Sequence, residues 1–145
     1  MLKKFFLCVI CVAGCYLFMV AGVKEEAYSG TLIGTWMRQD KQCSVTIYTQ
    51  GDKYCGKITW LQNPNVNGKP AMDTHNNRPL MGMQVLQGFS YEGHKIWSEG
   101  KMYEPAEGKD HSCKIKLVDY NTLEVHDFTG LPIFGGQNET WKRVK

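Results

Sequence analysis

The stretch Leu32-Ile33-Gly34-Thr35-Trp36-Met37-Arg38 has the composition of a β-strand and places a glycine two residues before a tryptophan. Near the other end of the chain, Thr140-Trp141-Lys142-Arg143-Val144 is a second strand-like run, with a tryptophan two residues before an arginine. A barrel has no free edge only when its first and last strands pair with each other. We therefore expect the two runs to meet, with Gly34, Trp36, Trp141 and Arg143 at the closure of a β-barrel.

Between these ends, short runs of alternating apolar and polar residues recur at near-regular spacing, and no helical periodicity is visible. Such spacing predicts an all-β domain, namely a single eight-stranded up-and-down antiparallel barrel. A barrel of eight strands is just wide enough to hold one small ligand. The predicted strands cover residues 31–38, 43–48, 54–61, 81–91, 94–103, 112–118, 122–128 and 140–144.

Residues 1–22 have the layout of a secretory signal peptide. Lys3-Lys4 precedes an apolar run over residues 5–20, and Val20-Ala21-Gly22 supplies a small-residue exit. We therefore expect an exported protein, periplasmic or secreted. Residues 23–30 then form a short tether, and residues 31–145 form one barrel domain.

A second cleavage signal gives an alternative. Val12-Ala13-Gly14-Cys15 has the form of a lipobox, in which Cys15 becomes the lipidated first residue of a lipoprotein. Ordinary cleavage near Gly22 is favoured, because the apolar residues 16–20 would follow the lipidated cysteine where a polar tether is usual. Membrane association is expected only if Cys15 is lipidated.

Charge and chemical motifs exclude several function classes. Without the two signal lysines the formal net charge falls from +3 to +1, and the lysines are spread singly, which argues against nucleic-acid binding. No serine stands in a Gly-x-Ser-x-Gly elbow, and the turn carboxylates Glu104 and Glu107 are expected to be solvated. We expect neither an enzyme nor a cofactor. We also expect no metal site, because the histidines lack the spacing that aims two rings at one ion. These are His75, His94, His111 and His126.

Three cysteines lie beyond the signal segment: Cys43, Cys55 and Cys113. Export permits a disulfide, but three is an odd number, so at least one thiol is left over. A disulfide between two of them and three buried thiols both remain open from the sequence.

Two groups of residues are candidates for ligand binding. Large aromatics on the predicted strands either line a cavity or fill the core, and the sequence does not fix which of them point inward. These are Trp60, Phe89, Trp97 and Tyr103. The long break at residues 62–79 contains Asp73 and Arg78. Arg78 could orient an anionic head group at a barrel mouth, or the loop is pinned by its own hydrogen bonds with Asp73 as the partner of Arg78.

Several short motifs follow one another along the chain. They are Gly34-x-Trp36, Gly56-Lys57-Ile58-x-Trp60, Arg78-Pro79-Leu80-x-Gly82, Gly100-x-x-Tyr103-x-Pro105-x-x-Gly108-Lys109, Phe134-Gly135 and Trp141-x-Arg143. Taken in this order, they resemble the exported bacterial family called domain of unknown function 2147. The resemblance implies a lipocalin-like (calycin-type) barrel without established enzymatic activity. In calycins the Gly-x-Trp of the first strand packs beneath an arginine of the last, here Trp36 and Arg143.

The chain departs from the family pattern at two places. Asp110-His111 stands where an aromatic residue is common, and Asp127 stands where a glycine is common.

Two functions remain from the sequence. The first is an exported binding protein that holds a small hydrophobic or amphipathic molecule, an acyl chain or lipid-like compound, in the barrel. The second is a non-enzymatic envelope interaction or structural module with a filled barrel. An enzyme ranks third, because no nucleophile or acid–base pair is visible.

Overall fold

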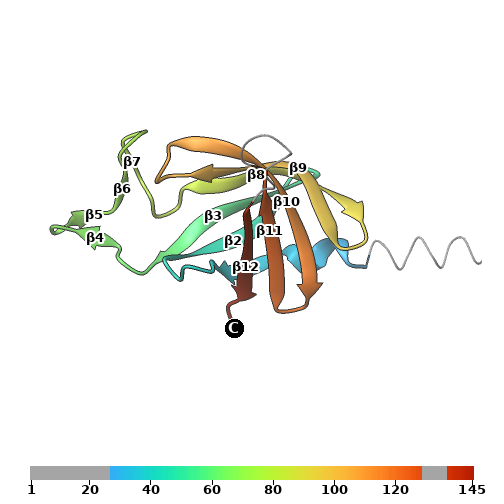
Figure 1. Cartoon of the computed structure of the whole chain (residues 1–145). Helices are drawn as coiled ribbons and strands as arrows, with labels where there is room; N and C mark the ends of the chain where they lie inside the picture. The colour runs from blue at the N-terminus through green and yellow to red at the C-terminus, as the bar shows by residue number, and fades with distance from the viewer. Residues whose placement is uncertain (1–26, 129–136) are drawn as a thin grey trace, which may run out of the picture.

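The computed structural model describes residues 27–128 and 137–145 and shows a closed eight-stranded antiparallel barrel (Figure 1). Each strand pairs with its sequence neighbour around the barrel, and the last pairs with the first, which confirms the predicted fold class. The barrel strands are β1 (Gly34–Met37), β2 (Cys43–Gln50), β3 (Lys53–Leu61), β8 (Gln84–Gly93), β9 (Ile96–Glu104), β10 (Lys109–Asp119), β11 (Thr122–Asp127) and β12 (Gln137–Arg143). The predicted signal peptide, with Cys15, and the Phe134-Gly135 motif lie outside the described residues.

The first strand is shorter than the sequence predicts. A 3₁₀ turn, η1 (Ser29–Leu32), occupies the end of the expected tether and the start of the expected strand, so β1 begins at Gly34. The Thr31 amide donates to the Tyr28 carbonyl within this turn instead of joining a strand ladder. In the described part of the chain, no helix combines the length and the apolar character needed to cross a membrane.

Arg143 closes one end of the barrel. Its guanidinium carbon lies 4.1 Å from the ring centre of Trp36 and 4.3 Å from that of Tyr120, so the cation is held between two aromatic rings. The same group donates to three backbone carbonyls, from Nε to Tyr120 (2.7 Å), from Nη1 to Ile33 (3.1 Å) and from Nη2 to Thr31 (2.6 Å). The predicted contact between Trp36 and Arg143 is therefore present.

Position 34 requires glycine because the guanidinium of Arg143 lies against its backbone. Its φ is +145°, and a Cβ at this position would come within 2.4 Å of Arg143 Nη1. A side chain here would push the arginine away from Trp36.

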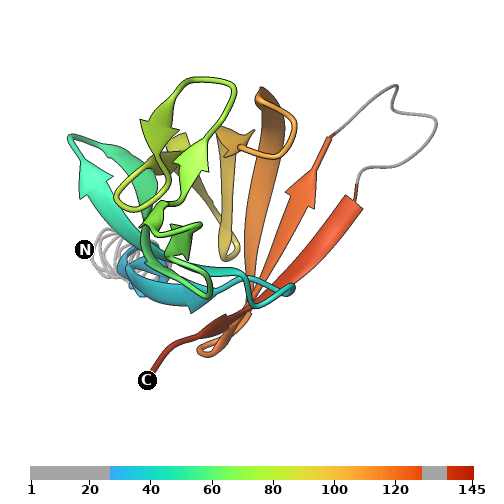
Figure 2. The same ribbon diagram turned by 90° about the vertical axis from the view of Figure 1, so that its left-hand side faces the viewer.

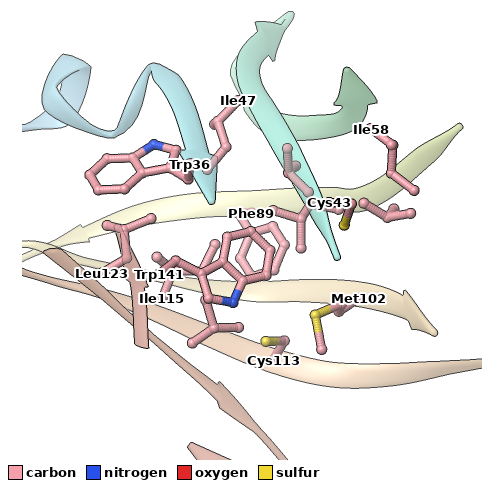
Figure 3. Close-up of a cluster of buried hydrophobic side chains, with 14 of the residues drawn as sticks. Trp36, Cys43, Ile47, Ile58, Phe89, Met102, Cys113, Ile115, Leu123 and Trp141 are labelled. Carbon is pink, nitrogen blue, oxygen red and sulfur yellow. The ribbon is translucent and has the colours of Figure 1, made fainter. Parts of the chain in front are cut away.

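The half of the barrel next to this closure is filled by large side chains (Figure 3). Trp97 is fully buried, with the rings of Tyr91 and Tyr54 packed against it at 4.9 and 6.1 Å between centres. The ring of Phe89 crosses Gly100, where an added Cβ would meet it at 2.3 Å. Phe89 and Trp97 therefore fill the core.

The long break between β3 and β8 is not a structureless loop. It forms two small hairpins, β4 (Asn65–Val66) with β5 (Lys69–Pro70) and β6 (Met72–Asp73) with β7 (Arg78–Pro79). Both stand beyond the end of the barrel at which β3 ends and β8 begins, and Figure 2 views the molecule from their side.

The closure predicts that Arg143→Ala destabilises the fold. The variant loses two cation–aromatic contacts and three hydrogen bonds to carbonyls, which together are worth about 2 kcal/mol at this half-exposed site. For a domain of this size, the melting temperature should fall by about 8 °C. Arg78→Ala is the matched control, because Arg78 is exposed, and it should change stability by less than about 0.5 kcal/mol. Equal melting temperatures for Arg143→Ala and the wild type would contradict the closure.

Candidate functional site

A pocket of about 410 Å³ lies at the open end of the barrel, opposite the Arg143 closure. Its size falls within the range of small-molecule sites, roughly 300–1,000 Å³. Figure 3 shows Trp36 at one end of the buried cluster and Ile58, Cys43 and Met102 toward the other, where the pocket begins. The apolar wall includes Cys43, Val45, Ile58, Leu61, Leu80, Val85, Met102 and Trp141.

A half-buried ion-pair network joins three elements at this pocket. Arg38 follows β1, and its Nη2 donates to Glu104 Oε2 of β9 (3.1 Å) and to Glu139 Oε1 of β12 (2.9 Å). The indole Nε1 of Trp141 donates to the other oxygen of Glu139 (2.8 Å), and the Arg38 guanidinium lies 5.9 Å from the centre of the Trp141 ring. Trp141, predicted as part of the closure, lies on the closing strand β12 and also lines this pocket.

The network keeps Arg38 charged. Burial disfavours the charged guanidinium, but the negative charges of Glu139 and Glu104 outweigh that effect and raise the pKa of Arg38 above its ordinary value. The Arg38 side chain is only 15% exposed, and its Nε has no hydrogen-bond partner among the described residues. Glu104, expected to be solvated, is 21% exposed and engaged with the arginine.

Asp73 ties the β6–β7 hairpin to the barrel. The carboxylate is 1% exposed and accepts hydrogen bonds from Tyr103 Oη (2.6 Å), Asn76 Nδ2 (2.9 Å) and the His75 amide (3.0 Å). The hydrogen bond from Tyr103 is the main reason that the pKa of Asp73 lies below its ordinary value, and it raises the pKa of Tyr103. The loop is therefore pinned by hydrogen bonds that Asp73 accepts from within the loop and from Tyr103 of β9, and Tyr103 rather than Arg78 is the principal side-chain partner of Asp73.

Arg78 lies outside the apolar pocket. It is exposed on β7 and lines a second hollow of about 690 Å³, together with Asn76, Gln84 and Tyr103. Tyr103 also lines the apolar pocket, so its side chain forms a wall shared by the two hollows.

Trp60 faces the outside of the barrel, where 44% of it is exposed. The register between β2 and β3 shifts between the pairs Ser44↔Trp60 and Val45↔Ile58. At this β-bulge two consecutive residues, Thr59 and Trp60, point outward, while Ile58 and Leu61 point inward. Strict alternation from Ile58 would have turned Trp60 into the interior.

Of the aromatic and loop candidates, the structure thus brings only Tyr103 into the apolar pocket, with Asp73 behind it. Phe89 and Trp97 belong to the core, and Trp60 and Arg78 lie elsewhere on the surface. Arg38 and Glu139 were missed because 101 residues separate them in the sequence and nothing local marks the pair.

The two departures from the family pattern contact each other. His111 Nδ1 lies 3.4 Å from Asp127 Oδ1, and His111 Nε2 lies 2.8 Å from Glu107. Burial is the largest cause of the raised pKa of Asp127, and the charge of His111 acts in the opposite direction. His111 therefore lies within ion-pair distance of both Asp127 and Glu107.

Cys43, Cys55 and Cys113 are buried and free, so none of them forms a disulfide. Burial raises the pKa of Cys43 to about 11 and that of Cys113 to about 12, which makes both weak nucleophiles near neutral pH. In residues 27–128 and 137–145, no three His, Cys, Asp or Glu side chains are placed to hold a metal ion.

A meandering eight-stranded barrel with one plugged end and one open pocket defines a lipocalin-like protein. Comparison with solved structures supports this class: the chain is similar to Protein HP1028 from the human pathogen Helicobacter pylori, described as belonging to the lipocalin family. The two are 19% identical with a TM-score of 0.63, over 79% of this chain and 83% of that one, a level of similarity that concerns the fold alone.

Residues 34–143 match the model of domain of unknown function 2147, described as an uncharacterized protein conserved in bacteria. The chain belongs to this family. No curated protein matches the sequence.

The Asp73–Tyr103 contact predicts that Tyr103→Phe loosens the β6–β7 hairpin. Hydrogen exchange should quicken at the amide of Leu80, whose bond to the Ala71 carbonyl closes the base of this hairpin, and stay unchanged in β10 and β11. Uniform exchange in the variant and the wild type would show that the hydroxyl does not hold the hairpin.

The same pair predicts a pH dependence. Because the folded-state pKa of Asp73 is lowered, its stabilisation is present above the ordinary carboxyl value of about 4 and is lost as pH falls through the lowered pKa. The difference in melting temperature between the wild type and Tyr103→Phe should be constant from about pH 5 to 7 and should shrink below about pH 4. A difference that grows in acid would contradict this assignment.

Proposed function

We propose that this protein is exported and holds one small hydrophobic or amphipathic molecule, an acyl chain or lipid-like compound, in the pocket at the open end of its barrel. The observation that carries the proposal is the 410 Å³ pocket, with an apolar wall and a polar network at one side. Apolar walls with a few placed polar groups are the usual form of small-molecule sites.

The wall of the pocket supplies area for an alkyl chain. Val45, Ile58, Val85 and Met102 are all buried, and they come from four different strands that surround the same space. Burial of apolar ligand surface against such a wall is favourable by about 25 cal/mol per Å² before the cost of association is counted.

The alternative is an envelope interaction or structural module with a filled barrel. This description fits the half of the barrel around Trp36, Phe89 and Trp97. It does not account for the pocket beside Met102, and for that reason ligand binding is the preferred function.

Titration calorimetry with 1-decanol, a neutral amphiphile, tests the binding function. The wild type should bind one molecule per chain. Leu80→Trp adds bulk at a half-buried position of the pocket wall and should weaken binding at least about tenfold, because the chain of the ligand loses its space.

Trp60→Phe is the matched control for this titration. Trp60 lies on the outer face, so its replacement should leave the affinity unchanged. Absence of binding to the wild type, or equal binding by Leu80→Trp with an unchanged melting curve, would contradict the proposal.

Export is tested by the intact mass of the protein isolated from the cells that make it. The expected mass is that of a chain cleaved near Gly22, because residues 1–22 have the layout of a signal peptide. A mass that begins at Cys15 with added lipid would indicate a membrane-anchored lipoprotein instead, and an intact chain from Met1 would contradict processing.

A further inference from the structure

The free hydrogen-bond donors of Arg38 indicate which head group the pocket takes, an inference that rests on the proposed binding function. A guanidinium carries five N–H donors, one on Nε and two on each terminal nitrogen. The bonds to Glu104 and Glu139 both start from Nη2. Among the described residues, no oxygen accepts a hydrogen bond from Nε or from Nη1. One side of the guanidinium therefore has donors without acceptors.

This free side belongs to the pocket. Arg38 is one of the residues that line the pocket, and 15% of its side chain stays exposed. Nε is buried without a partner, so Nη1 is the nitrogen that a ligand oxygen reaches. An apolar wall with a single placed donor group is the usual arrangement by which a small-molecule site orients its ligand.

The positive charge of Arg38 is already compensated. Glu104 Oε2 and Glu139 Oε1 lie 3.1 and 2.9 Å from its Nη2. A ligand carboxylate at Nη1 would be a third negative charge around one cation, and repulsion from the two glutamates would offset its attraction to the arginine. The free side thus offers hydrogen bonds without an uncompensated charge.

An ammonium group does not satisfy these donors. It has three N–H donors and no acceptor, so it would leave Nη1 unpaired. It would also place a second positive charge beside the guanidinium. An uncharged oxygen, in contrast, accepts a hydrogen bond from Nη1 and adds no charge to the site.

We propose that the head group of the ligand is uncharged and carries an oxygen that accepts a hydrogen bond from Arg38 Nη1, as the hydroxyl of an alcohol or the carbonyl of an acyl ester does. The alkyl chain packs against Ile58 and Met102 in the same pocket. Arg38 then has two roles, since it joins β9 to β12 through Nη2 and orients the ligand through Nη1.

Three ligands with the same ten-carbon chain separate the head groups. 1-Decanol is uncharged and accepts hydrogen bonds, decanoate accepts them but is an anion, and decylammonium only donates them. Their affinities are measured by titration calorimetry at pH 7 and below their micelle concentrations. 1-Decanol should bind at least about tenfold more tightly than either ion, as expected for one hydrogen bond to a charged group.

Arg38→Met removes the donors and keeps an unbranched side chain. In this variant 1-decanol should bind at least about fivefold more weakly, because its oxygen loses the hydrogen bond. Decylammonium should bind more tightly, because Glu104 and Glu139 no longer have a cation between them. A general preference of apolar pockets for uncharged ligands would be the same in both proteins, so the opposite changes report on Arg38.

Arg78→Met is the matched control. It makes the same substitution at an exposed arginine outside the apolar pocket, and it should leave all three affinities unchanged. Melting curves show whether the two variants are folded.

A second measurement needs no variant. The Nε–H signals of Arg38, Arg78 and Arg143 can be followed by ¹⁵N–¹H NMR while 1-decanol is added. A hydrogen bond at Nη1 changes the electron distribution of the whole guanidinium. The Arg38 signal should therefore shift in proportion to bound ligand, while the signals of the other two arginines stay in place.

The outcomes distinguish this inference from the proposed function. If either ion binds as tightly as 1-decanol, or if the Arg38 signal stays in place while 1-decanol is bound, the assignment of the head group is wrong and binding of a small molecule stands. If 1-decanol does not bind to the wild type, the proposed function fails, and the head-group assignment fails with it.

Discussion

The guanidinium of Arg143 is the interaction on which the rest of the barrel depends. The ladder between β1 and β12 contains only two residue pairs, Trp36↔Arg143 and Met37↔Lys142, which is a short seam for a closed barrel. Arg143 extends the connection by bonding the carbonyls of Ile33 and Thr31, which precede β1. The strand ends are thus held by a side chain where the backbone ladder is brief, and Gly34 supplies the space that this side chain occupies.

Closure at one end allows the other end to stay open. Trp36, Trp97 and Phe89 occupy the closed half, and Gly100 lets the Phe89 ring cross the barrel. Smaller or more flexible side chains such as Val45 and Met102 follow toward the opposite mouth, where the pocket lies. The aromatic rings of Trp36, Phe89 and Trp97 thus fill the closed half, and the pocket lies beyond them.

The polar residues at the pocket act first on the protein itself. Arg38 joins β9 to β12 through Glu104 and Glu139, and Asp73 joins a hairpin to β9 through Tyr103. Both arrangements hold neighbouring segments at the mouth in fixed positions.

The strands and the seam could be predicted from the sequence, because alternation and the motifs around Trp36 and Arg143 are local signals. The direction of Trp60 could not, since one β-bulge reverses the alternation that precedes it. The ion pairs of Arg38 could not be predicted either, because they join residues that are far apart in the sequence. In the sequence alone, Glu104 looks like an ordinary carboxylate in a turn. Local patterns thus decide the strands, whereas bulges and distant pairings decide which side chains form the pocket.

The four tryptophans test this account in one measurement, because each stands in a different part of the barrel: Trp36 at the closure, Trp97 in the core, Trp60 on the outer face and Trp141 at the pocket. Their indole N–H signals can be followed by ¹⁵N–¹H NMR while 1-decanol is added. The account predicts that the Trp141 signal shifts in proportion to bound ligand while the signals of Trp36 and Trp60 stay in place. A shift of Trp36 or Trp60 with no change at Trp141 would contradict it.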